Sequence, residues 1–281
     1  MPTVRELLSA WGLRRIAAAI QASAKPSLRL SATSRSKGAC ARIGGARNLP
    51  RNLEWPAWKG QPLAFLAQFD LAALPEIPGF DLPREGALFF FHQAGENPAW
   101  GYDPRHRGSA RVLHTDRPLG SSALRPQPRA LEKGRQYTGL RLRVEPLEWT
   151  IPDSSDLIVR QLGLSDDEER RYDEMLEAIS TQRPDICHRT GGYPDHIQND
   201  MRLEAQLVSN GMSWGNSDWY GTPKARRLEP GAAEWELLFQ IDSEERAGMM
   251  WGDTGRIYFL IRNEDLRKRR FNKVWAILQC G

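Results

Sequence analysis

The chain of 281 residues lacks most of the features that identify a protein's class directly. Its cysteines are few, Cys40, Cys187 and Cys280, an odd number without C-x-x-C spacing. That usage is unlike a disulfide scaffold and typical of a reducing compartment, so we expect a cytoplasmic protein. No apolar run reaches membrane-spanning length, and charged residues interrupt the N-terminus where a signal peptide would be apolar. We therefore expect no membrane partner.

Neither sign of charge dominates the sequence. Lys plus Arg number 39 and Asp plus Glu number 35, which leaves a formal net charge of +4. The densest basic run, residues 267–270, follows the acidic residues 264–265, an order that suits the dipole of a short exposed helix. A nucleic-acid surface would need clustered basic residues, so we expect no nucleic acid partner.

Recognisable catalytic motifs are also missing. The chain has neither a P-loop nor a G-x-G-x-x-G sequence. Residues 211–215 (GMSWG) match the string of a nucleophile elbow, but a turn-rich segment follows where that motif requires a helix. The sequence therefore does not predict a hydrolase, and we expect no cofactor.

What the chain does contain is a pattern that occurs twice. PLAFLAQFDL at 62–71 is followed by GALFFF at 86–91, and WELLFQIDS at 235–243 is followed by WGDTGRIYFLI at 251–261. In each copy a hydrophobic run ends in Gln-x-Asp, and a Gly-Gly step precedes it. Internal repetition constrains architecture more strongly than local propensity does. We predict one domain over 1–281, with an N-terminal helix (1–25), a first repeat half (26–150) and a second (151–281).

Strands in hairpin-like pairs, set apart from the helices, predict an α+β fold. The links between the strands are too short for the crossovers of a parallel sheet, so we expect largely antiparallel sheets built from duplicated strand-loop-strand units. A capping box at Thr3 predicts an amphipathic helix over roughly 4–24, and another at Ser165 predicts a second helix. Residues 95–136 are rich in Gly, Pro and Arg and predict a long loop with a short strand near 111–114.

These segments, in this order, resemble the YwqG-like family, a bacterial family with a domain of unknown function. The resemblance is carried by the two repeat copies, by HRTGGYPDHIQND at 188–200, and by the terminal Gln279-Cys280. It covers about residues 40 to 280. One position departs, because Arg47 stands where the first Gly-Gly step is usually followed by proline. The resemblance implies an α+β fold with internal duplication and brings no established reaction, cofactor or catalytic residue.

The paired Gln-x-Asp motifs are the first site candidates. Gln68 with Asp70, and Gln240 with Asp242, each place an amide and a carboxylate on one face of a strand. Packed about a pseudo-twofold axis, the two pairs would line a shared pocket with Asp253. The alternative, which we favour, is structural: each Asp ends its strand and caps the following turn, each Gln satisfies backbone groups, and Asp253 holds its own turn.

Two further groups of residues have alternative interpretations. Trp214, Trp219 and Tyr220 lie in a loop rich in Gly, Asn and Ser, where exposed rings would suit an interaction surface and inward rings would cover the core. His188 and His196 flank a Gly-Gly bend, but they lack the organised spacing of a metal site, so we expect no metal.

For function, we expect a non-enzymatic protein-binding module, because no coherent set of nucleophile, base or metal ligands is present. One form would be an immunity or antitoxin-like protein with a toxin or effector as partner. The alternative is a small-ligand binder or an enzyme with its pocket between the repeats.

Overall fold

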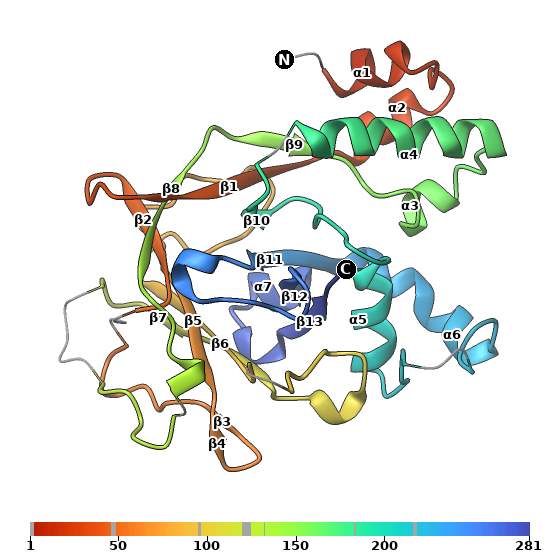
Figure 1. The fold of residues 1–281 in the computed structure, drawn as a ribbon. Helices are drawn as coiled ribbons and strands as arrows, with labels where there is room; N and C mark the ends of the chain where they lie inside the picture. Colours follow the sequence, from red (N-terminus) through yellow and green to blue (C-terminus); the bar gives the residue numbers. More distant parts are fainter. Residues whose placement is uncertain are drawn as a thin grey trace.

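The computed structural model describes residues 3–45, 49–94, 97–119, 125–131, 133–182, 184–215 and 218–281. Arg47, the residue that departs from the family pattern, lies outside them. One large antiparallel sheet dominates the described chain, and its strands run in the order β13-β12-β11-β10-β1-β8-β2-β5-β6-β7, with β9 beside β1 (Figure 1). The expected α+β class and the antiparallel pairing are confirmed.

The strands of this sheet are β1 (Lys25–Thr33), β2 (Ala39–Ile43), β5 (Ala64–Asp70), β6 (Ala87–His92), β7 (Ala110–Thr115), β8 (Leu140–Val144), β9 (Glu148–Thr150), β10 (His188–Gly191), β11 (Trp235–Asp242), β12 (Arg256–Arg262) and β13 (Trp275–Gln279). A separate small hairpin consists of β3 (Ala57–Trp58) and β4 (Gln61–Pro62). The α-helices are α1 (Val4–Ala10), α2 (Ala17–Ser23), α3 (Leu157–Arg160), α4 (Asp166–Thr181), α5 (Met201–Ser209), α6 (Pro223–Leu228) and α7 (Asn263–Arg267).

The sheet bends until its two arms face each other across one core. Phe90 of β6 lies against Phe239 of β11 and Phe259 of β12, with ring centroids 4.9 and 5.2 Å apart. Apolar residues occupy both faces of β5 and β11, because the outer face of each arm is covered as well. Helix α5 packs Met201, Ala205 and Val208 against the outer face of β11–β13. This double cover explains why neither strand shows a simple apolar-polar alternation.

The predicted single helix over 4–24 is wrong: the structure divides it into α1 and α2. Gly12 adopts a positive φ of 72°, which ends α1 and lets the chain turn back. An added Cβ there would lie 2.3 Å from Arg171 Nη1, the end of a flexible side chain that can move aside, so the positive φ is the main reason for glycine at this turn. The apolar spacing was nonetheless informative, since Leu8 and Ile20 are buried together against Tyr172 and Met175 of α4.

The second predicted helix is confirmed. Ser165 accepts a hydrogen bond from the backbone N–H of Glu168, and the Glu168 carboxylate accepts one from the N–H of Ser165, which completes the capping box of α4. Arg15 binds the same carboxylate at 2.6 Å. Helices α1, α2 and α4 thus form a layer over the β1–β9 end of the sheet (Figure 1). None of the helices in the described ranges combines the length and the apolar character needed to cross a membrane.

The two Gln-x-Asp strands each pair an arginine of a neighbouring strand with their glutamine. Arg42 of β2 pairs with Gln68 of β5, and Arg189 of β10 pairs with Gln240 of β11. In both cases the following strand pairs antiparallel with the Gln-x-Asp strand, β6 with β5 and β12 with β11. The duplication stays a prediction, but these registers show which residues it would relate.

Candidate functional site

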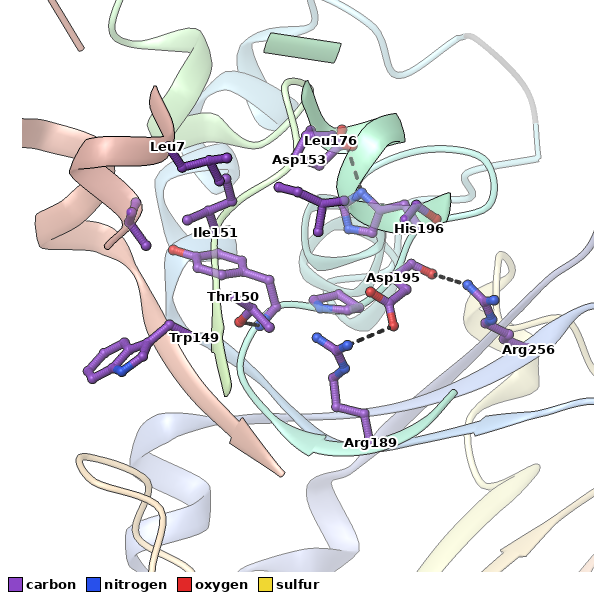
Figure 2. Close-up of a pocket in the computed structure, with 15 residues that line it drawn as sticks. Leu7, Trp149, Thr150, Ile151, Asp153, Leu176, Arg189, Asp195, His196 and Arg256 are labelled. Atoms are coloured by element: carbon purple, nitrogen blue, oxygen red, sulfur yellow. Dashed lines mark hydrogen bonds and ion pairs between the residues drawn. The ribbon is translucent and has the colours of Figure 1, made fainter. Parts of the chain in front are cut away.

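A cavity of about 170 Å³ lies between the helical layer and the sheet. Figure 2 shows side chains reaching it from α1, α4, β9, β10 and the segment that follows β10. Its apolar wall consists of Val4, Leu7, Ile151, Leu176 and Ile179. Trp149 stands beside this wall with 56% of its surface exposed. One side of the cavity is therefore apolar, and the large exposed ring of Trp149 lies beside it.

Arg189 forms the charged floor of the cavity. Its side chain is fully buried, and its Nη2 lies 2.8 Å from Glu148 Oε1 and 3.2 Å from Asp195 Oδ2. Its Nε and Nη1 are also buried, and neither has a hydrogen-bond partner among the described residues. Buried side-chain polar atoms normally have a hydrogen-bond partner, so two nitrogens that lack one among the described residues set Arg189 apart from an ordinary buried arginine.

Asp195 is held in place by the second Gln-x-Asp motif. Gln240 Oε1 accepts a hydrogen bond from the Asp195 backbone N–H at 2.9 Å, and Gln240 Nε2 donates to the Asp195 carboxylate at 3.1 Å. Tyr258 and Arg256 both donate to the Asp195 carbonyl oxygen, at 2.6 and 3.2 Å. Gly192 permits the preceding bend, because its φ is 73° and an added Cβ would lie 2.7 Å from the Ser27 side chain.

Asp242 forms hydrogen bonds with several residues close to Arg189, the floor of the cavity. Its Oδ2 accepts hydrogen bonds from the Cys187 N–H and from Arg256 Nε, both at 2.9 Å. Its own backbone N–H donates to His188 Nδ1 at 3.1 Å. Gln240 and Asp242 thus work from beneath the cavity and position the residues that line it.

The cysteine and histidine of this region are held in unreactive states. Burial raises the pKa of the Cys187 thiol to about 11, so it is protonated and a poor nucleophile at neutral pH. Burial lowers the pKa of His188 to about 4, so its ring is neutral. His188 Nδ1 already accepts the Asp242 bond, which removes this nitrogen from proton transfer.

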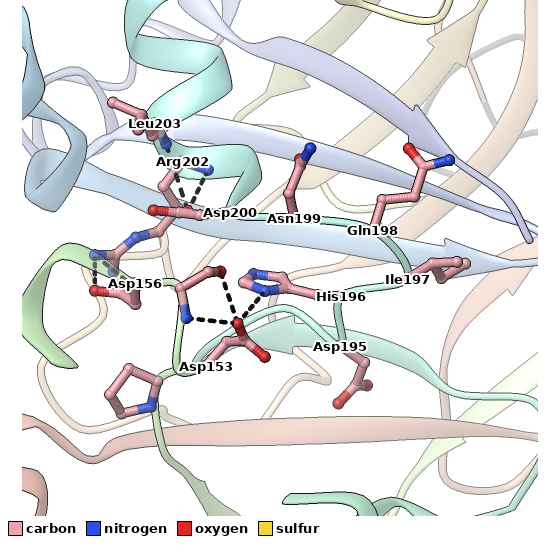
Figure 3. Close-up of polar contacts among 12 residues, drawn as sticks. Asp153, Asp156, Asp195, His196, Ile197, Gln198, Asn199, Asp200, Arg202 and Leu203 are labelled. Carbon is pink, nitrogen blue, oxygen red and sulfur yellow. Dashed lines mark hydrogen bonds and ion pairs between the residues drawn. The ribbon is translucent and has the colours of Figure 1, made fainter. Parts of the chain in front are cut away.

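His196 and Asp153 form a second charged pair at the cavity wall (Figure 3). His196 Nδ1 lies 3.6 Å from Asp153 Oδ1, and the same oxygen accepts hydrogen bonds from the Ser155 N–H and Oγ at 2.9 and 2.7 Å. Burial opposes ionisation of both groups. Their mutual contact prevails, so the pKa of Asp153 is lowered and that of His196 is raised.

Deeper in this wall, Arg202 binds Asp156 in an ion pair at 3.1 Å with both side chains buried. Asp200 accepts from the Arg202 backbone N–H at 2.8 Å and caps α5. These contacts fix the segment between β10 and α5, which carries Asp195 and His196.

The first Gln-x-Asp motif lies elsewhere. Gln68 is buried in β5, and Asp70 Oδ1 accepts a hydrogen bond from the Ala72 N–H at 3.2 Å in the turn that follows. Asp253 is exposed in its own turn, where its Oδ1 accepts from Thr254 Oγ1 at 3.3 Å. The shared pocket of the alternative interpretation is not formed around this cavity, because none of its five described residues lines it. Gln240 and Asp242 lie beneath the cavity and bond to Asp195 and Arg256, which do line it. Gln68, Asp70 and Asp253 lie apart from it.

The aromatic loop divides its rings between two environments. Trp214 and Trp219 stack with centroids 4.4 Å apart and pack against the apolar cluster around α5 and α6. Tyr220 projects outward with 79% of its surface exposed. Neither His188 nor His196 belongs to a metal-binding group, since no three His, Cys, Asp or Glu side chains of the described residues are arranged to hold an ion.

Sequence reasoning did not identify four residues that line the cavity, namely Arg189, Arg256, Asp153 and Trp149. Arg189 and Asp195 do belong to the segment HRTGGYPDHIQ, which stands out as the partner of the second repeat copy. The ion-pair partners of Arg189 could not be deduced, because Glu148 belongs to a strand that packs there only through β1.

Comparison with known proteins adds one positive finding. A search of curated proteins yields no match for this chain. The sequence profile of DUF1963, a domain of unknown function, matches residues 41–280, which covers both repeat copies and the floor of the cavity. The chain therefore belongs to the DUF1963 family.

Proposed function

We propose that this protein binds a small organic molecule in the Arg189 cavity. The observation that carries the proposal is the meeting of an apolar wall with a charged floor, Arg189, two of whose nitrogens have no hydrogen-bond partner in the part of the chain that the structure describes. Ligand sites in proteins commonly combine apolar surroundings with a few fixed polar groups. The buried ion pairs of Arg189 and the bonds of Gln240 supply the rigid support that such groups need.

The size of the cavity limits the ligand. An apolar cavity of about 150 Å³ holds a benzene molecule, so this one suits a molecule of roughly six to ten non-hydrogen atoms. Burial of about 100 Å² of apolar ligand surface contributes about 2.5 kcal/mol, and one charge-assisted hydrogen bond adds about 1.5–3 kcal/mol. The sum corresponds to a Kd on the order of 0.1–1 mM for a fragment, a range that sets the concentrations for a screen.

Binding rather than catalysis is favoured by the protonation states at the floor. The Cys187 thiol is protonated and the His188 ring is neutral and buried, so they do not form a nucleophile and base pair. A non-enzymatic role agrees with the sequence expectation and remains part of the proposal. We also propose that the chain is YwqG-like within this family, that its two halves are an internal duplication, and that the protein is cytoplasmic.

The test is a ligand-observed NMR screen of small fragments against the wild type and two variants. Ile179→Phe fills the cavity from α4, whereas Glu177→Phe adds the same ring to an exposed position of that helix. We expect fragments that bind the wild type and Glu177→Phe but not Ile179→Phe. The proposal fails when no fragment binds, or when binding survives in Ile179→Phe.

Protein binding is the second candidate function, and Tyr220 is the observation that favours it. Its ring is 79% exposed beside the stacked Trp214–Trp219 pair, a rigid aromatic support of the kind found in binding surfaces. An immunity or antitoxin-like protein would use such a surface against its toxin. Purification from the native host should then recover one defined partner with the wild type and with Met250→Ala, but not with Tyr220→Ala. Met250 is the matched control because it is also exposed, at 56%.

A further inference from the structure

Asp153 presents an unused oxygen at the cavity. All three of its described polar contacts, with the Ser155 N–H, the Ser155 hydroxyl and His196 Nδ1, engage Oδ1. Within the described ranges Oδ2 has no hydrogen-bond or ion-pair partner, and the side chain is 34% exposed. His196 keeps the carboxyl ionised, since their contact lowers the pKa of Asp153 despite burial. The cavity wall thus carries a fixed anionic acceptor.

Arg256 presents an unused donor at the other side of the same segment (Figure 2). Its Nε donates to Asp242 at 2.9 Å and its Nη1 donates to the Asp195 carbonyl oxygen at 3.2 Å. Within the described part of the chain Nη2 has no partner, and the side chain is 20% exposed. Because its other nitrogens are fixed, the direction of this donor is fixed as well.

The charged side chains around the cavity form ion pairs with one another, including Asp153 and Arg256 through their other atoms. Arg189 is paired with Asp195 and Glu148, Arg256 with Asp242, and His196 with Asp153. A ligand with a large net charge would add an uncompensated charge to a largely buried site, which costs several kcal/mol. A ligand that carries one charge of each sign would meet Asp153 Oδ2 and Arg256 Nη2 without this penalty.

We propose that the ligand is a small amino carboxylate with an apolar body. Its carboxylate binds Arg256 Nη2, its ammonium group binds Asp153 Oδ2, and its hydrocarbon part lies against Leu7, Ile151 and Leu176. This inference rests on the proposed function and adds the chemical class of the ligand. Charge-assisted hydrogen bonds at both ends would supply the selectivity that an apolar wall lacks.

The test compares two isomers, leucine and ε-aminocaproate, which have the same atoms but different separations between the amino and carboxylate groups. Hexylamine and hexanoate serve as controls because each keeps a comparable body and only one charge. Calorimetric or NMR titration of the wild type should show that at least one isomer binds about 10-fold or more tightly than both controls, the effect expected for one lost charge-assisted bond.

Asp153→Asn assigns the ammonium contact. This change keeps the oxygen that accepts from Ser155 and removes the charge, so the affinity for the preferred isomer should fall about 10-fold while that for hexanoate stays unchanged. Asp173→Asn on the exposed face of α4 is the matched control and should leave both affinities unchanged. The titrations of the wild type decide the proposal independently of whether the Asp153 variant folds.

The outcomes separate the two levels of the proposal. If hexylamine or hexanoate binds as tightly as both isomers, the amino carboxylate class is refuted while small-ligand binding stands. If neither isomer binds but other fragments do so in a way that Ile179→Phe abolishes, the class is again refuted. If no fragment binds at all, the proposed function fails first.

Discussion

Phe69 and Phe239 meet edge to face across the core, with ring centroids 4.8 Å apart. They come from β5 and β11, the two strands that end in Gln-x-Asp. Neighbouring residues of a strand point to opposite faces, so Gln68 and Gln240 point away from this shared core. Phenylalanine rings join the two arms of the bent sheet, and the Gln-x-Asp pairs lie on the opposite face of each arm, where Gln68, Gln240 and Asp242 are also buried.

The Phe239 contact should be one of the most important for stability. Phe239→Ala removes a fully buried ring that touches Phe69, Phe90 and Phe259. We expect the free energy of unfolding to fall by about 3–5 kcal/mol. Urea unfolding followed by fluorescence measures it, with exposed Tyr220→Ala as a control that should change stability by less than about 0.5 kcal/mol. Equal effects of the two substitutions on stability would contradict the conclusion that phenylalanine contacts in the core hold the two arms of the sheet together.

Arg189 should be required for folding as well as for the cavity. Arg189→Met preserves most of the side-chain volume but leaves Glu148 without its 2.8 Å partner and Asp195 without its 3.2 Å partner. Breaking a buried ion pair in this way costs about 3–5 kcal/mol. Arg143→Met removes a 52% exposed arginine from its pair with Glu145 and should cost at most about 1 kcal/mol. Comparable urea midpoints for the two variants would show that the Arg189 pairs contribute little.

Local signals in the sequence predicted local structure well. The apolar runs predicted β5 and β6, and the capping box at Ser165 predicted the start of α4, because continuous apolar runs and short-range hydrogen bonds determine these features. The break at Gly12 was missed because a glycine within an apolar helical pattern is compatible with both a continuous and a divided helix.

The cavity could not be predicted in the same way. Its wall combines Leu7, Ile151 and Leu176, which are brought together only by the packing of α1 and α4 over β9. The Gln-x-Asp motif is the same in both copies, yet of the two glutamines only Gln240 has Asp195 as a neighbour. The difference arises from the segment after the second Gly-Gly step, whose fold depends on Tyr258 and Arg256.

His188 should make the protein sensitive to acid. Burial lowers its pKa from 6.5 to about 4. Between these two pH values the His188 side chain is protonated in the unfolded chain and neutral in the folded chain. Stability is therefore lost as the pH falls from 6.5 towards 4, by up to about 3 kcal/mol. His188→Asn keeps an acceptor for the Asp242 N–H and does not titrate. The stability difference between wild type and variant, measured by urea unfolding across this range, should change in favour of the variant as the pH falls. A constant difference would show that His188 is protonated equally in both states.

Glu204 should make the stability of the protein depend on pH in the opposite direction. It is buried on α5, and burial together with the nearby Asp200 carboxylate raises its pKa from 4.5 to about 8. The folded protein keeps this carboxyl protonated at neutral pH, whereas the unfolded chain ionises it, so stability declines as the pH rises from 4.5 through 8. Glu204→Gln removes the titration and retains the shape of the side chain. We expect the variant to match the wild type in stability at acid pH and to exceed it by about 1–4 kcal/mol at neutral to mildly alkaline pH.

Glu177→Gln, an exposed change on α4, should show no such pH-dependent gain in stability. Urea unfolding of the three proteins across this pH range measures the effect, and a wild type that stays more stable than Glu204→Gln at alkaline pH would mean that the buried carboxylate is ionised and paired in the folded state.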